Sequence, residues 1–466
     1  MKKAGLLTTI LCAAALLYGF MATPGEPAPK RPNVLIIMTD QQTNDCLSLM
    51  GNPNLKTPNM DALAKSGVYF TESYCSSPVC GPSRSSLLTG RMPHETGVVW
   101  NSTHISASTP TIGTIFSKAG YNTAWAGKWH LPEAYPAKSG KDSVNGFKVL
   151  PVHLAKESWE LGEDTDQPIA DAAVKYLKEY KDTSPFILAV SLHNPHDICH
   201  VPRQPANYAK ASQIKDPLPP LPANFNPPLK EPQWLEEKRQ MDHYGDELLR
   251  TQHYTEADWQ AYLYHYYRFA EKVDGEIGKI MSALRERKLD ENTIIVFTSD
   301  HGDGSAAHKW AAKLSLYEEA VSVPFGISWK GHIPAGRIDR NQLVSNIDLA
   351  PTLCDYAGIT NHPAFTGTSL RKVLENPDAT LRSYVVVQLE DDKENQSRHA
   401  RMIRDQRYKY NVYNQGANNE QLFDLWNDPG ETRNLAYETN YQPVKERLRK
   451  NLSQWKSSTR DTHAIP

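Results

Sequence analysis

Three segments of the chain are apolar at nearly every position and end in polar residues. They are NVLIIMTD at residues 33–40, FILAVSLH at 186–193 and TIIVFTSD at 293–300. Runs without a hydrophilic face are typical of central strands in a parallel sheet that helices cover on both sides. Because ligands of open α/β sheets bind at the carboxyl ends of the strands, we expect the three polar ends to converge.

Helical patterns lie between these apolar segments. Residues 59–66 follow Thr57-Pro58, residues 112–119 end before Gly120, and residues 256–287 carry one long apolar stripe. Residues 201–232 are rich in proline and polar side chains, which predicts an excursion over the surface near the strand ends. The alternation of apolar strands and amphipathic helices indicates an α/β fold.

The pattern changes after about residue 370. Residues 384–389, 400–403 and 408–413 have the character of short strands, and residues 441–455 predict a closing helix. We therefore expect a small antiparallel sheet with a helix, joined to the main domain. The predicted division is a main domain at 33–370 and a C-terminal subdomain at 371–466.

The first residues differ in character from the rest of the chain. A short basic start, Met1-Lys2-Lys3, precedes an apolar run from Leu6 to Ala22, and several prolines follow. This layout predicts a signal peptide at 1–22 and a linker at 23–32. The alternative is a membrane anchor, but the run is barely long enough and lacks a charged stop. We expect export to the periplasm or outside the cell, without stable membrane insertion.

Charge and cysteine content narrow the class of protein. The 466 residues include 51 Lys and Arg against 53 Asp and Glu, a formal charge of −2 at pH 7. A dominant role in nucleic-acid binding normally needs a basic excess, so we expect no nucleic-acid partner. Without Cys12 five cysteines remain, an odd number, so at least one is unpaired or chemically used. Cys75 and Cys80 could form a local bridge.

The strongest local signal is Cys80-Gly81-Pro82-Ser83-Arg84, which Leu88-Thr89-Gly90-Arg91 follows. Pro82 suits the first position of a helix with Gly81 as its cap, which would place Cys80 where free N–H groups favour an anion. Arg84 adds a fixed cation. These residues fit a reactive cysteine beside an anion pocket, and they also fit a buried cysteine before an ordinary helix.

C-x-P-S-R followed by Thr-Gly-Arg resembles the signature of the formylglycine-dependent (type I) sulfatases, a family of the alkaline-phosphatase superfamily. The resemblance extends from about residue 33 to about residue 455. It implies an alkaline-phosphatase-like α/β fold, in which a mixed sheet lies between helices. It also implies that a formylglycine-generating maturation enzyme converts Cys80 to 3-oxoalanine, whose hydrate is the nucleophile.

The resemblance includes two metal motifs, Asp40-Gln41 and Asp300-His301. The first usually reads Asp-Asp, so Gln41 is a departure that replaces a carboxylate with an amide. The implied ligands are Asp40, Gln41, Cys80, Asp300 and His301. Oxygen ligands favour a hard cation, so Ca²⁺ is expected ahead of Mg²⁺. The alternative is that Asp40 and Asp300 only cap the segments that follow them.

Further segments that resemble the family supply the remaining candidate residues. Lys128 and His130 would project to one face of an extended segment, where they suit a dianionic group and a proton transfer. The resemblance implies that His196 is the acid for the leaving oxygen, that His130 is the base, and that Lys128 and Lys313 hold the sulfate. The expected catalytic set is Cys80, Arg84, Lys128, His130, His196 and Lys313. The expected substrate-binding set is His193, His308 and Trp310.

Together these features predict an exported sulfatase that hydrolyses a carbohydrate sulfate ester, on a glycan fragment or at a chain end. One alternative is a phosphodiester or phosphonate monoester hydrolase, because some such enzymes share the fold and the cysteine motif. The other is a non-catalytic glycan-binding relative that kept the pocket.

Overall fold

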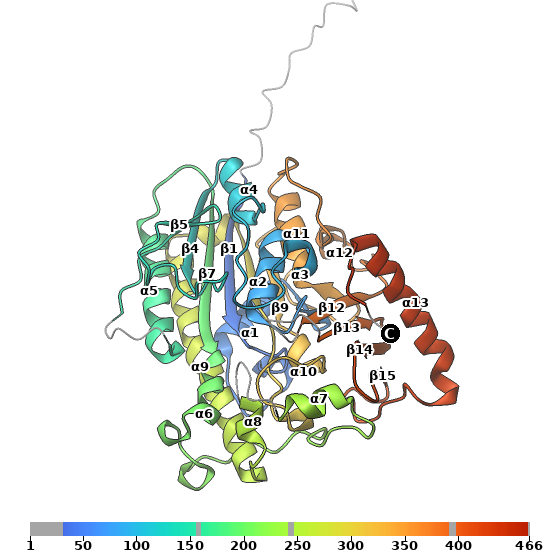
Figure 1. Ribbon diagram of the computed structural model, residues 1–466. Coiled ribbons are helices and arrows are strands. Elements are labelled where there is room, and N and C mark those ends of the chain that lie inside the picture. The colour runs from blue at the N-terminus through green and yellow to red at the C-terminus, as the bar shows by residue number, and fades with distance from the viewer. Residues whose placement is uncertain (1–30, 155–159, 241–246, 391–397, 465–466) are drawn as a thin grey trace, which may run out of the picture. The chain divides into compact units, whose positions relative to one another are not determined.

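The computed structural model describes residues 31–154, 160–240, 247–390 and 398–464 (Figure 1). The predicted signal peptide and most of the predicted linker lie outside the described residues. Residues 32–466 form one compact unit. The expected boundary near residue 370 therefore remains a prediction.

The three apolar segments are adjacent strands at the centre of the main sheet. β1 (Asn33–Asp40) pairs in parallel with β7 (Phe186–Pro195) on one side and with β8 (Thr293–Ser299) on the other. The full order is β10-β2-β9-β8-β1-β7-β4-β6-β5. β9 runs antiparallel to β8 and β2, and β5 runs antiparallel to β6, so the sheet is mixed, as the family resemblance implies. The other strands are β2 (Val68–Phe70), β4 (Asn122–Gly127), β5 (Ser143–Val144), β6 (Phe147–Val149), β9 (Phe325–Trp329) and β10 (Arg337–Asp339).

Side chains of β1 enter a different hydrophobic core on each face of the sheet. Val34 and Ile36 lie in one core, and Leu35 and Ile37 lie in the other. The strand therefore lacks a hydrophilic face because helices cover both sides. Burial of each such aliphatic side chain contributes about 1.5–3 kcal/mol. The helices on the Val34 side are α2 (Cys80–Thr89), α4 (Ile112–Lys118), α11 (Leu349–Tyr356) and α12 (Arg371–Glu375), and those on the Leu35 side are α1 (Pro58–Lys65), α5 (Gly162–Glu179) and α9 (Glu256–Glu286).

Helix α5 is the main element that the sequence analysis does not anticipate. It spans 18 residues and contains Pro168 in its interior, which normally argues against a helix. Its Ile169, Ala173 and Leu177 nevertheless recur at helical spacing and are buried against the sheet. The apolar stripe is the signal that would have revealed this helix.

The C-terminal part is a four-stranded antiparallel sheet in the order β12-β13-β14-β15, with a helix on one face. The expected elements appear as β12 (Val385–Glu390), β13 (His399–Arg404), β14 (Tyr408–Tyr413) and α13 (Gln442–Thr459). The sequence pattern does not predict β15 (Glu420–Asp424), which is only five residues long. Figure 1 shows α13 along the outer side of this sheet, where Leu448 and Leu452 are buried.

A surface excursion and several short helices and strands make up the rest of the described fold. About half of residues 201–232 are exposed, and the segment forms an excursion over the surface, as expected. Within the described residues, no helix is both long and apolar enough to cross a membrane. The remaining elements are α3 (Pro93–Thr96), α6 (His200–Arg203), α7 (Gln233–Lys238), α8 (Glu247–Thr251), α10 (Glu318–Val321), β3 (Ser73–Tyr74) and β11 (Val344–Ser345).

Candidate active site

The polar ends of the three central strands meet, as their sequences predict. Asp40 ends β1, His196 follows β7 and Asp300 follows β8. The Nε2 atom of His196 lies 3.9 Å from Oδ1 of Asp40, and the backbone nitrogen of Gln41 donates to Oδ1 of Asp300 at 3.1 Å. The carboxyl edge of the sheet thus gathers two carboxylates and an imidazole from distant parts of the chain.

Cys80 is the first residue of α2, and Val79 is the N-cap. This corrects the expected cap at Gly81 and start at Pro82, which both lie within the first turn. Gly81 has a different role, because its backbone nitrogen donates to Oδ1 of Asn101 at 2.7 Å, and a Cβ there would lie 3.2 Å from Asn101. The local bridge that Cys75 and Cys80 could have formed is absent, since both are free, buried thiols.

Cationic and imidazole groups surround the sulfur of Cys80. Its Sγ lies 2.9 Å from Nζ of Lys313 and 3.1 Å from Nε2 of His301, and His130 also hydrogen-bonds to it. Burial and the Asp40 carboxylate act to raise the pKa of this thiol, but Lys313, His301 and His130 lower it well below its usual range. The pocket therefore stabilises negative charge at position 80.

Arg84 holds the two carboxylates in place. Its Nη2 lies 2.7 Å from Oδ2 of Asp40, and its Nε lies 2.7 Å from Oδ2 of Asp300. Its Nη1 donates to the Lys128 carbonyl at 2.9 Å and to Oγ of Ser191 at 2.8 Å. The guanidinium is buried, and nearly all of its donors are used. Arg84 therefore orients Asp40 and Asp300, and Ser191 is a supporting residue that the sequence analysis missed.

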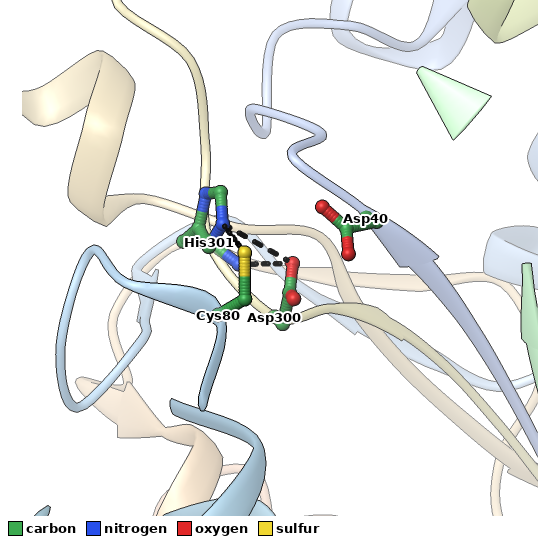
Figure 2. A group of neighbouring side chains, drawn as sticks. All are labelled: Asp40, Cys80, Asp300 and His301. Carbon is green, nitrogen blue, oxygen red and sulfur yellow. Dashed lines mark hydrogen bonds and ion pairs between the residues drawn. The ribbon is translucent and has the colours of Figure 1, made fainter. Parts of the chain in front are cut away.

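Figure 2 shows four side chains that could hold a metal ion, namely Asp40, Cys80, Asp300 and His301. Their ligand atoms lie within 4.8 Å of one another, and all four residues are buried. Oδ1 of Asp40 is buried without a hydrogen-bond partner among the described residues. Nδ1 of His301 lies 2.8 Å from the Gly302 carbonyl, which leaves Nε2 facing the group. This donor set fits a divalent cation.

The side chain of Gln41 lies among Cys199, Asp303 and Lys313. Its Nε2 donates to Oδ2 of Asp303 at 2.8 Å, and its Oε1 lies 3.4 Å from Nζ of Lys313. Tyr262 also donates to Asp303, at 3.0 Å. Asp303 belongs to the same SDHGD segment as Asp300 but is not among the predicted site residues. Coordination of a metal by Gln41 remains a prediction.

Lys128 and His130 both reach the site, but not as alternate residues of a strand. β4 ends at Gly127, and His130 has a φ of +59°, so the segment turns instead of extending. Gly127 permits the turn because its φ is +94°, and a Cβ there would lie 2.1 Å from the Ser191 carbonyl. Lys128 Nζ contacts Oδ2 of Asp40 at 2.7 Å, whereas His130 contacts Cys80.

His193, near the end of β7, and His196, which follows that strand, lie in different environments. Nε2 of His196 lies 3.4 Å from Nζ of Lys313, and burial together with Lys128 lowers the pKa of His196 to about 3. His193 stacks against Tyr135, which also hydrogen-bonds to its Nδ1, and its Nε2 lies 3.5 Å from Oδ1 of Asp197. His196 is thus the histidine that faces Cys80, while protein groups enclose His193.

The other two expected substrate contacts are packed inside the protein. His308 is fully buried and stacks on Tyr317 with ring centroids 3.8 Å apart. Trp310 is also fully buried, and its Nε1 donates to the Lys313 carbonyl at 2.9 Å. The expectation that these rings contact a sugar is therefore corrected, because neither ring has a face open to solvent. Trp310 instead supports the loop that carries Lys313.

Comparison with known proteins identifies the family. Residues 32–359 match the family model described as Sulfatase. The chain belongs to the sulfatase family. The C-terminal part of this sulfatase, residues 306–458, matches the model described as N-sulphoglucosamine sulphohydrolase, C-terminal. Over 452 residues this sulfatase is 30% identical to the Delta 4,5-hexuronate-2-O-sulfatase of Bacteroides thetaiotaomicron, which covers 94% of this chain and 91% of that protein.

Solved structures agree with this assignment. A structure described as a 2-O GAG sulfatase superposes with a TM-score of 0.83 at 29% identity, covering 94% of this sulfatase and 95% of that chain. The phosphonate monoester hydrolase of Agrobacterium radiobacter superposes with a TM-score of 0.73 at 24% identity, over 93% and 96% of the two chains, which shows a shared fold alone. The predicted family, fold class and sulfuric ester hydrolase activity are confirmed.

Proposed function

We propose that this sulfatase hydrolyses carbohydrate sulfate esters, using a formylglycine at position 80 and a bound Ca²⁺. The observation that carries the proposal is the environment of Cys80 Sγ, where Lys313 and His301 lie within 3.1 Å beside two oriented carboxylates. Such a pocket suits a nucleophile that becomes anionic and a transition state whose negative charge must be stabilised.

The bound cation and the formylglycine at position 80 would lie together in this pocket. Asp40, Asp300 and His301 would hold the cation, and Gln41 supplies a further amide oxygen if its side chain turns from Lys313. Oxygen ligands favour Ca²⁺ over softer metals. When bound, the cation and the formylglycine hydrate supply Lewis-acid polarisation and a hydroxyl nucleophile.

The chain's own residues bind sulfate and move protons. Lys313 contacts Cys80 and Lys128 contacts Asp40, and both lysines can hold sulfate oxygens. His196 is neutral at rest because burial and Lys128 lower its pKa to about 3, and an anionic substrate beside it raises that pKa again. His196 then gives a proton to the leaving oxygen, and His130, next to position 80, accepts the proton that accompanies sulfate release.

The substrate class rests on the relatives and on the N-terminal pattern. One relative is named a Delta 4,5-hexuronate-2-O-sulfatase, and one similar structure is described as a 2-O GAG sulfatase. The pattern of residues 1–22 favours export, where sulfated glycans are met. We therefore propose a sulfated glycan fragment or chain end as substrate, in the periplasm or outside the cell. The N-terminal sequence of the mature protein tests export.

The substrate experiment compares sulfate release from three kinds of compound. These are unsaturated disaccharides sulfated at the hexuronate 2-position, the same disaccharides sulfated on the hexosamine, and an aryl sulfate. A phenylphosphonate monoester serves as the control for the alternative hydrolase. The proposal expects a sugar sulfate to give the highest kcat/KM. Faster turnover of the phosphonate than of every sulfate would contradict it.

A further inference from the structure

A second group of metal-binding side chains lies apart from the ligand group at Cys80. His308, Glu319 and Glu431 each offer one ligand atom, and these atoms lie within 4.8 Å of one another. His308 and Glu431 are fully buried, and Glu319 is partly buried. We call these three residues together with Asn224 the Glu319 cluster. Nothing in the proposed reaction uses them.

The amide of Asn224 faces more acceptors than it can satisfy. Its Nδ2 lies 2.8 Å from Oε1 of Glu319, 3.0 Å from the Gly430 carbonyl and 3.3 Å from Nε2 of His308. An amide nitrogen carries two hydrogens, so it cannot donate to all three atoms when Nε2 of His308 is unprotonated. Oε2 of Glu319 is also buried without a hydrogen-bond partner among the described residues. A rotated Asn224 amide would present an oxygen to the same centre.

The charges around the cluster do not balance. Glu318, Glu319 and Glu431 bring three carboxylates together, and Nζ of Lys409 lies 2.9 Å from both Glu318 and Glu431. The nearby Arg239 is already paired with the Glu231 carboxylate. One ammonium therefore faces three carboxylates in a buried place, where unpaired charge is costly. A divalent cation would remove this surplus.

We propose that the Glu319 cluster binds Zn²⁺, through Nε2 of His308, the carboxylates of Glu319 and Glu431, and the rotated amide oxygen of Asn224. The cluster offers four donors, which is the number that zinc takes, whereas calcium takes about six to eight oxygens. These four donors would complete a tetrahedral coordination.

The proposed zinc joins three segments that are far apart in the sequence. Asn224 belongs to the surface excursion, His308 and Glu319 flank the segment that carries Lys313, and Glu431 belongs to the C-terminal part. Trp310 lies two residues after His308, and its indole holds the Lys313 carbonyl at 2.9 Å. A cation at the cluster would therefore fix the loop that places Lys313 against Cys80.

The test is zinc binding to protein whose other metal site is already filled. Purified enzyme is saturated with Ca²⁺, dialysed against Zn²⁺, and analysed for metal content. We expect the wild type to retain a single Zn²⁺ per chain, with a higher Tm than the zinc-free protein. Glu319→Gln and His308→Gln should lose both effects. Glu318→Gln is the matched control, because it removes a neighbouring carboxylate outside the cluster and should keep the zinc.

Several results would overturn the proposal. Wild type that retains no zinc, or folded Glu319→Gln and His308→Gln that retain as much as wild type, would show that the cluster is not a site. Loss of zinc in Asp40→Asn alone would assign it to the site at Cys80. Anomalous diffraction at the zinc edge from wild-type crystals needs no variant. It should place the ion about 2 Å from Nε2 of His308, and a peak elsewhere would contradict the proposal.

Discussion

Nζ of Lys313 lies 2.9 Å from Sγ of Cys80, and both side chains are buried. This contact puts a fixed positive charge beside the atom from which the nucleophile derives, so Lys313 acts on charge that grows during attack on sulfur. Removal of one such group from a preorganised site typically lowers kcat by about 10²–10³-fold. We therefore expect Lys313→Ala to lower kcat/KM by that order.

The matched control for this variant is Lys309→Ala, because Lys309 is exposed on the same loop. Steady-state sulfate release measures both variants, and circular dichroism checks that both are folded. Equal activity of Lys313→Ala and Lys309→Ala would contradict a role for Lys313 at the reacting centre.

Replacement of Cys80 tests the nucleophile. We expect Cys80→Ala to be folded and to lose about 10⁶-fold in kcat, as other enzymes do when a covalent nucleophile is removed. Cys354→Ala is the control, because Cys354 is a buried thiol of α11 outside the site and should keep its activity. Activity of Cys80→Ala above about a hundredth of wild type, far above that loss, would be incompatible with the assignment.

The proton donor is tested by the choice of leaving group. An aryl sulfate has a good leaving group and needs little help from an acid, whereas a sugar alcohol needs a proton. We expect His196→Ala to lower kcat/KM for a sugar sulfate by about 10²–10⁴-fold and for an aryl sulfate by much less. The measurement is the ratio of the two kcat/KM values in wild type and variant. A ratio that does not change would argue against His196 as the acid.

Metal removal tests the ligand group of Asp40, Asp300 and His301. After dialysis against a chelator we expect activity to fall, and to return to a larger extent with Ca²⁺ than with Zn²⁺ alone. The activity of Asp40→Asn should not return with either ion, because the unpartnered Oδ1 of Asp40 is the oxygen available to the cation. Full activity in protein that elemental analysis shows to be metal-free would refute the metal requirement.

Asp166 on α5 should make the free energy of unfolding depend on pH. Burial raises the pKa of this carboxyl to about 8, although the backbone nitrogens of His193 and Asn194 donate to it. The unfolded chain loses the proton near pH 4, so between about pH 4 and 8 the folded state binds more protons and its stability falls as pH rises.

We therefore expect the free energy of unfolding of wild type to fall between pH 5 and pH 8 relative to Asp166→Asn, by at most about 1.4 kcal/mol per pH unit. Denaturant unfolding at several pH values measures this difference. Asp171→Asn, an exposed acid on the same helix, should track wild type. A constant difference between wild type and Asp166→Asn would show that Asp166 is ionised throughout.

The central sheet could be predicted because the residues of β1 themselves indicate a buried strand with a polar end. Val34 to Met38 are apolar at every position since both faces of the strand are covered, and Asp40 stands where such strands bind ligands. Helix α5 is less evident because Pro168 interrupts the usual helix signal. β12 and β14 follow from their β-branched and aromatic residues, whereas β15 has no β-branched residue.

The site was predictable to the extent that its residues lie at strand ends or in the cysteine motif. The direction in which a side chain points after a turn could not be predicted. Gln41 turns toward Asp303 and Lys313 from a left-handed backbone position, and Trp310 packs inward although the exposed Lys309 directly precedes it. Ser191 lies within a buried strand, where nothing local distinguishes it from a structural serine.

The most direct test of the account is a mass spectrum of the peptide that contains Cys80, taken from the preparation whose sulfatase activity has been measured. Conversion of the thiol to formylglycine lowers the peptide mass by about 18 Da. We expect this mass change to be present in active protein, and its extent to follow the specific activity across preparations. Full activity in protein whose Cys80 peptide carries only the unmodified thiol would contradict it.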